Sequence, residues 1–205
     1  KGEAARAPIY LVDEKTGRAQ SIARNQEVAV PIPAEGKDEE EAWKYPKRNK
    51  QGMIEFEMKP ISYFEKKAID KGIPDVGKYI YKNLIQRQVE LAKGEGQRYI
   101  SIAKEYEGQY EHLKKQRESI EKLKDKYPAD ARYKAIVLAE GMKISPHEGT
   151  PQYDDFLKDP FNYLRSKEED IKLQADGYLR AGSSQAAQAH EIEREIDRKK
   201  PITEY

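Results

Sequence analysis

Apolar residues recur at every seventh position through the middle of the chain, in a segment whose other residues are mostly charged. Between residues 99 and 127 one apolar column is unbroken, and a second column, three residues later, is apolar at its ends and polar in its middle. This spacing is typical of a coiled-coil helix that packs along one stripe. The predicted packing seam comprises Tyr99, Ile102, Tyr106, Leu113, Ile120, Leu123 and Tyr127. The pattern leaves open whether the seam pairs within the chain or with another chain.

Helix start and stop signals precede the seam. Ser62 can cap a short helix that ends at Gly72, and Pro74 can occupy the first position of a second helix. Gly94 and Gly96 then either end or bend that second helix, because each costs about 1 kcal/mol relative to alanine in a helix interior.

Three further helices are expected after Pro128, which closes the seam. Asp130 can cap a helix that contains the apolar run AIVLA and that we expect to be well buried. Asp159 and Pro160 supply a cap and a first position for the next helix, and the stretch GSSQ interrupts the chain before a final one. Connections of this length suit antiparallel packing.

The first 58 residues read differently, with short apolar runs that alternate in period two. The runs around Asp13–Gly17 predict a small hairpin. Pro31 and Pro33 remove backbone donors, so the segment VAVPIP is expected to be an arm or an edge strand. The segment MIEFEM at residues 53–58 has the alternation of a half-buried strand and could pair with the first hairpin.

The predicted fold is therefore mainly α, with long charged helices that form an antiparallel helical hairpin or loose bundle. An extended N-terminal arm containing a small β-hairpin precedes the helices. We expect three parts: the arm at residues 1–59, a helical segment with the seam at residues 60–128, and a second helical segment with a C-terminal tail at residues 129–205.

Composition limits the core and the partners. Hydrophobic residues make up 37% of the 205 residues and charged residues another 37%, against roughly 45–50% and about 25% in ordinary domains. A chain with so little apolar surface is expected to complete its burial against other proteins. The formal net charge of +1 makes nucleic acid an unlikely partner. No apolar run reaches the ~18–20 residues of a membrane helix, so only peripheral association with a membrane complex is expected.

The sequence shows no constellation of reactive groups that is typical of an enzyme. His112, His147 and His190 are far apart, cysteine is absent, and the Gly-x-Gly of KGEGQRY lacks the rest of a phosphate-binding motif. Adjacent carboxylates such as Asp154 and Asp155 are expected by chance among 37 acidic residues. We therefore expect no catalytic residue, no cofactor and no metal.

Tyrosine is the abundant aromatic, with 14 residues against four phenylalanines and one tryptophan. Its large apolar ring and polar tip suit interfaces that stay partly wet. Aromatic residues in arms and loops are thus the candidates for partner contact: Tyr10, Trp43, Tyr45, Tyr153 and Tyr205.

These features predict a non-catalytic structural or accessory subunit of a large multiprotein assembly, bridging its neighbours through the long helix and the termini. The start at Lys1 is consistent with removal of a targeting peptide and equally with a cloned fragment. On the first interpretation we expect a location on the mitochondrial matrix side, in a respiratory or ATP-synthase-type complex, with the cytoplasm as the other internal compartment. The alternative is an RNA-contacting component of a ribonucleoprotein such as an organellar ribosome, using Trp43, Tyr45 and the basic cluster Lys44, Lys47, Arg48 and Lys50.

Overall fold

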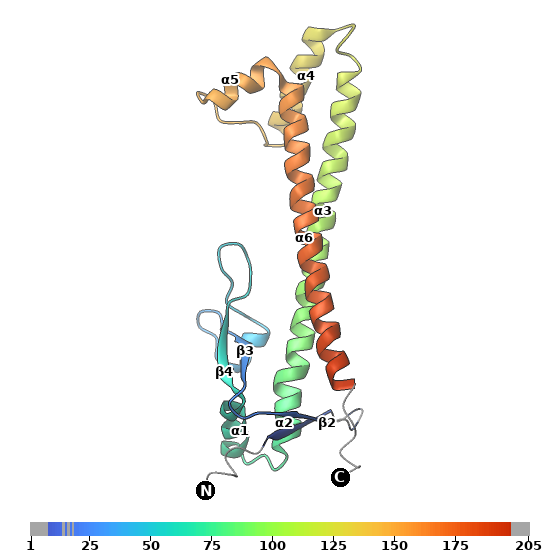
Figure 1. Ribbon diagram of the computed structural model, residues 1–205. Helices are drawn as coiled ribbons and strands as arrows, with labels where there is room; N and C mark the ends of the chain where they lie inside the picture. Colours follow the sequence, from blue (N-terminus) through green and yellow to red (C-terminus); the bar gives the residue numbers. More distant parts are fainter. Residues whose placement is uncertain (1–7, 14, 16, 18, 198–205) are drawn as a thin grey trace. The chain divides into compact units, whose positions relative to one another are not determined.

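The computed structural model describes residues 8–13, 15, 17 and 19–197, and its fold is mainly α with small antiparallel sheets near the N-terminus, as predicted (Figure 1). The strands are β1 Ile9–Val12, β2 Ala19–Ile22, β3 Glu27–Pro31 and β4 Phe56–Pro60. The helices are the 3₁₀ turn η1 Glu40–Trp43, α1 Ile61–Asp70, α2 Val76–Ile80, the π-helical segment η2 Tyr81–Ile85, α3 Gln86–Glu121, α4 Pro128–Gly141, α5 Pro151–Lys158 and α6 Pro160–Asp197.

These elements form two compact units that divide within helices α3 and α6. Unit 1 contains the described residues up to Glu95 and those from Gln185 onward, and unit 2 contains residues 96–184. The divisions fall at the two interruptions that the sequence predicted, the Gly-x-Gly of KGEG and the stretch GSSQ, although both helices continue through them. The expected three-part division at residues 59 and 128 stays a prediction; strands and helices on both sides of residue 59 contribute to one core.

Unit 1 contains two hairpins. Strand β1 pairs antiparallel with β2, from Ile9 opposite Ile22 to Val12 opposite Ala19, which confirms the hairpin around Asp13–Gly17. Strand β4 pairs with β3, from Glu27 opposite Pro60 to Pro31 opposite Phe56, and not with the first hairpin. The two hairpins therefore form separate two-stranded sheets.

The core of unit 1 draws on β1, β2, β3, α1, α2 and η2. Its buried members are Ile9, Leu11, Ile22, Val30, Ile61, Phe64, Ile80, Leu84 and Ile85. Helix α2 packs closely on β1, since a Cβ atom at Gly77 would lie 1.9 Å from the main-chain oxygen of Tyr10. The alternating apolar residues of the N-terminal strands therefore pack on helices within one core.

In unit 2, helices α3 and α6 run antiparallel and α4 and α5 pack on them. The buried core consists of Leu113, Ala131, Ala135, Ala139, Phe156, Phe161 and Leu164. Helix α4 buries only its face of alanines, four residues apart, while Tyr133 and Val137 are 67% and 46% exposed. The expectation that this helix is well buried is therefore wrong for one of its faces.

The structure places the seven seam residues unequally. Tyr99 and Leu113 are buried, Ile102, Tyr106, Ile120 and Leu123 are half-buried, and Tyr127 is 53% exposed because α3 already ends at Glu121. The column of residues that begins with Tyr99 continues every seven residues, through Tyr106 and Leu113. The residues that alternate with this column in the packing lie four positions after its members, not three: Ala103 is buried, and Tyr110 and Arg117 are half-buried. Tyr178 of α6 packs between Tyr99 and Tyr106, with ring centroids 6.0 and 5.6 Å away.

Gly182 of α6 allows α3 and α6 to cross closely. A Cβ atom at Gly182 would lie 2.8 Å from the main-chain oxygen of Gly96 and 3.2 Å from the main-chain nitrogen of Ile100. Contacts this short with backbone atoms can be relieved only if the helices separate. Glycine at position 182 is therefore required by packing, despite its low helix propensity.

Replacing Gly182 by alanine is expected to lower the free energy of unfolding by about 1–3 kcal/mol, because the methyl group overpacks the crossing. The matched control is Gly108→Ala on α3, where nothing lies within 4 Å of the added Cβ and the residue is exposed. This control should stabilise the chain by up to about 1 kcal/mol. Chemical denaturation of both variants measures the difference, and equal effects of the two substitutions would contradict a close crossing.

A buried ion-pair network joins α3 to α6 farther along the pair. The Arg117 guanidinium donates from Nε to Glu168 at 2.5 Å, from Nη2 to the same carboxylate at 3.1 Å, and from Nη1 to Glu121 at 2.6 Å. Arg165 also contacts Glu121. The side chains of Arg117 and Glu168 are only 11% and 6% exposed. Charge thus occupies a position where the seam pattern would place an apolar residue.

Arg117→Ala is expected to destabilise the chain by about 3–5 kcal/mol, because it leaves the Glu168 carboxylate buried without its partner. The double variant Arg117→Met with Glu168→Leu should recover most of that loss, since no charge then remains buried. Arg180→Ala, at an exposed position of the same helix pair, is the control and should change stability by less than about 0.5 kcal/mol. If Arg117→Ala were as mild as the control, the network would be structurally unimportant.

Candidate functional site

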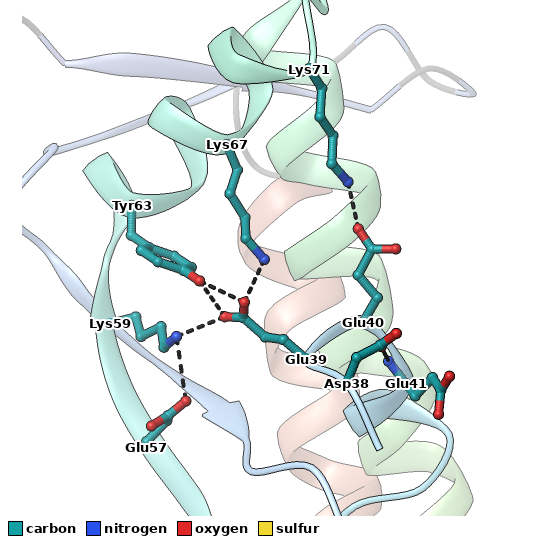
Figure 2. A network of polar contacts seen from close by, with 9 residues as sticks. All are labelled: Asp38, Glu39, Glu40, Glu41, Glu57, Lys59, Tyr63, Lys67 and Lys71. Atoms are coloured by element: carbon teal, nitrogen blue, oxygen red, sulfur yellow. Dashed lines mark hydrogen bonds and ion pairs between the residues drawn. The ribbon is translucent and has the colours of Figure 1, made fainter. Parts of the chain in front are cut away.

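The Glu39 carboxylate accepts hydrogen bonds from three side chains of β4 and α1 (Figure 2). Lys59 Nζ donates to Oε1 at 2.7 Å, Lys67 Nζ donates to Oε2 at 2.7 Å, and the Tyr63 hydroxyl lies 2.5 and 2.6 Å from the two oxygens. The three donors are four residues apart in sequence, which aligns Tyr63 and Lys67 on one face of α1. Glu57 also contacts Lys59, at 3.4 Å.

The surroundings of Glu39 determine its protonation. Partial burial raises the pKa of the carboxyl group, but the hydrogen bonds from Lys59, Lys67 and Tyr63 outweigh it and lower the pKa from 4.5 to about 2. Burial lowers the pKa of Lys59, and its hydrogen bond to Glu39 more than reverses this, so that the pKa is raised. The network is therefore fully charged over the ordinary pH range.

The acidic run Asp38–Glu41 builds this network through its local turn. Asp38 Oδ1 accepts from the main-chain nitrogen of Glu41 at 2.9 Å, where η1 begins, and Glu40 pairs with Lys71 at 2.5 Å. Glu39 of this run is therefore held by side-chain donors and is not simply solvated. The spacing of Lys67 and Lys71 was the sequence signal, since cations four residues apart on a helix can face a neighbouring acidic turn.

A small cavity lies beside the network. It has a volume of about 40 Å³ and is lined by Val30, Pro31, Glu39, Glu40, Trp43, Phe64, Lys67, Tyr79, Asn83 and Arg87. The Asn83 side chain donates to the main-chain oxygen of Tyr79 at 2.9 Å, which holds it in place. Aromatic rings and cations therefore meet around one cavity.

The second hairpin carries a distinct surface, the β4 face, which comprises Phe56 and Met58 with Met53 just before the strand. These side chains are 49%, 56% and 53% exposed. Glu57 and Lys59, which alternate with them, are the residues of this strand that join the Glu39 network. The half-buried strand predicted for MIEFEM thus has its apolar side turned to solvent.

The predicted partner-contact residues are placed differently from one another. Tyr10 is 55% exposed, and Tyr45 is 44% exposed with Lys37 and Lys44 over its ring at 4.6 and 5.5 Å. Trp43 is half-buried against the core of unit 1, and Tyr153 is half-buried beside Phe156 in unit 2. Tyr205 lies outside the described residues.

The basic cluster considered for RNA is partly neutralised. Arg48 donates to the buried Glu95 from both terminal nitrogens, at 3.0 and 2.8 Å, and Lys47 pairs with Glu55 at 3.1 Å. Two of its four cations are therefore already paired within unit 1. This reduces the positive charge that the cluster can offer to phosphate groups.

Groups that could carry catalysis are dispersed over the part of the chain that the structure describes. His112, His147 and His190 are exposed on α3, a loop and α6, and Asp154 and Asp155 are exposed on α5. No cluster of three or more histidine, aspartate or glutamate residues there could hold a metal ion. None of the described helices has a stretch long and apolar enough to span a membrane.

Comparison with protein-family models, curated proteins and solved structures finds no match for this chain. Function therefore has to be argued from these surfaces.

Glu39→Gln is expected to destabilise unit 1 by about 1–2 kcal/mol at neutral pH, because two lysines lose their anionic acceptor. The pKa of Glu39 is lower in the folded state, so its contribution is fully present above about pH 4.5 and disappears as the pH falls toward 2. The stability difference between wild type and Glu39→Gln should therefore shrink through that window. Denaturation series at several pH values measure it.

Glu35→Gln serves as the control, since Glu35 is exposed and makes none of the contacts seen at Glu39. It should leave both stability and pH dependence unchanged. A stability difference for Glu39→Gln that stays constant from pH 5 to about pH 2 would contradict the charged network.

Proposed function

We propose that the chain is a non-catalytic structural subunit of a multiprotein assembly, which binds a partner protein by strand addition at β4. The observation that carries this proposal is the exposure of Phe56 and Met58 on a strand that pairs with only β3 among the described strands. Large apolar side chains grouped on one strand are a feature of binding surfaces.

The hydrogen-bond pattern of the sheet supports an open edge at the same residues. The main-chain oxygen of Ala29 accepts from the Gln88 side chain of α3 at 3.0 Å, so it points away from β4. Ala29 lies opposite Met58, which makes this a non-hydrogen-bonded pair of the antiparallel ladder. Pro31, opposite Phe56, occupies the next such position, where its missing N–H is harmless.

It follows that the main-chain groups of Phe56 and Met58 point to the outer edge of β4, beside their exposed side chains. An extended strand of a partner could pair with that edge and place apolar side chains over this face. The occupant that we propose is therefore a β-strand of another protein with apolar residues at alternate positions. Mitochondrial respiratory and ATP-synthase-type complexes are the first assemblies in which we propose to look for it.

The test begins with mild purification from the native source and residue-resolved hydrogen exchange on the isolated chain and the assembly. In the isolated chain, the amides of Glu57 and Lys59 should already be protected by β3, while those of Phe56 and Met58 exchange. In the assembly all four should be protected. Unchanged exchange at Phe56 and Met58 would rule out strand addition, and a chain without companions would rule out the subunit role.

The double variant Phe56→Ser with Met58→Ser should weaken binding of the purified partner by at least about 30-fold, because the exposed apolar surface of two side chains no longer becomes buried. Ile69→Ser with Leu173→Ser is the matched control, since these side chains are 61% and 65% exposed elsewhere. The control should bind as wild type does. Equal loss in both variants would show that the β4 face is not the contact.

A further inference from the structure

The cavity beside Glu39 has the size of a small functional group. Since a water-sized group needs roughly 10–15 Å³, a cavity of about 40 Å³ holds about three such groups. A carboxylate has three heavy atoms. The rings of Trp43, Phe64 and Tyr79 line the cavity and could contact the short carbon chain that carries such a group.

The charges around the cavity leave one cation without an acidic partner. Both lining carboxylates are already bound, Glu39 by Lys59 and Lys67, and Glu40 by Lys71. Arg87 also lines the cavity and is half-buried, and among the described residues it pairs with no carboxylate.

The π-helical segment Tyr81–Ile85 aligns the polar wall of the cavity. Tyr79, Asn83 and Arg87 are four residues apart, and in a regular α-helix each such step would rotate the side chain about 40° farther around the axis. The wider π turn, closed by the Gln86 N–H donating to the Tyr81 oxygen, offsets that rotation. Three residues that would drift apart therefore line the same cavity. π segments of this kind are frequent at functional sites.

We propose that this cavity binds a carboxylate group, with Arg87 as its counter-ion and Asn83 beside it. A planar guanidinium binds a carboxylate through two parallel hydrogen bonds, and partial burial strengthens them. The carboxylate belongs either to a free small acid or to an acidic side chain of a partner. The β4 face takes no part in lining this cavity, so this inference is independent of the proposed function.

The chain carries its own reporter, because Trp43 lines the cavity and is the only tryptophan. Sodium propionate, titrated at constant ionic strength against sodium chloride, should change the Trp43 emission saturably, while propionamide should not. A comparison of N-acetyl-glutamate amide with its glutamine equivalent tests whether the carboxylate of an acidic side chain binds. A response to propionate indicates that a free acid suffices, and a response to the glutamate compound alone assigns the site to a partner's side chain.

Arg87→Gln should weaken the responding carboxylate by at least about tenfold, and Arg87→Lys, which keeps the charge but loses the planar fork, should lie between it and wild type. Arg180→Gln, at an exposed position of unit 2, should bind as wild type does. Thermal unfolding of each variant separates loss of binding from loss of folding. Four results would each overturn the proposal. These are no response to any carboxylate, equal responses to acid and amide, a saturable change of Trp43 emission with the cation tetramethylammonium instead of a carboxylate, and unchanged binding in folded Arg87→Gln.

Discussion

Hydrophobic and charged residues are equally frequent in this chain, so each unit has few apolar side chains with which to close a core. Both units meet this constraint by placing hydrogen-bonded ions next to their apolar clusters. In unit 1, Glu39 links η1 to β4 and α1, and Arg48 fixes the loop of the second hairpin on Glu95 of α3. In unit 2, Arg117 links α3 to α6. Because a partly buried ion is costly without its partner, these pairs restrict which arrangements of the helices are stable.

The sequence predicted the features that depend on local spacing. The first hairpin followed from alternation around a turn and the Tyr99 column from the seven-residue repeat. Gly96 and GSSQ mark the divisions between the units, although the helices predicted to be interrupted there continue. The sequence did not predict which column alternates with Tyr99, because Ala103 and Arg117 gave no apolar signal. The sequence also did not predict the pairing of β4 with β3. One contact that fixes the outer edge of β3 comes from the Gln88 side chain of α3, which lies far from β3 along the chain.

The candidate site was even harder to predict from the sequence. Its carboxylates and lysines are about 20 to 30 residues apart, as in Glu39 with Lys59 and Lys67, and many other pairs in so charged a chain have equivalent spacing. The π-helical turn that aligns Tyr79 with Arg87 has no marked sequence signature. Of the residues that line the cavity, only Trp43 was singled out in advance as a contact residue, and nothing in the sequence indicated the cavity.

The open edge of β4 also bears on how the isolated chain behaves. A short strand with exposed apolar side chains and unpaired main-chain groups is a template for any similar strand, including that of a second copy. Lys59 and Glu57, whose charges could keep such copies apart, are turned toward the Glu39 network. Under the proposed strand addition, chain synthesised in excess of a partner would tend to aggregate or be degraded, and its abundance in a cell would follow that of the partner.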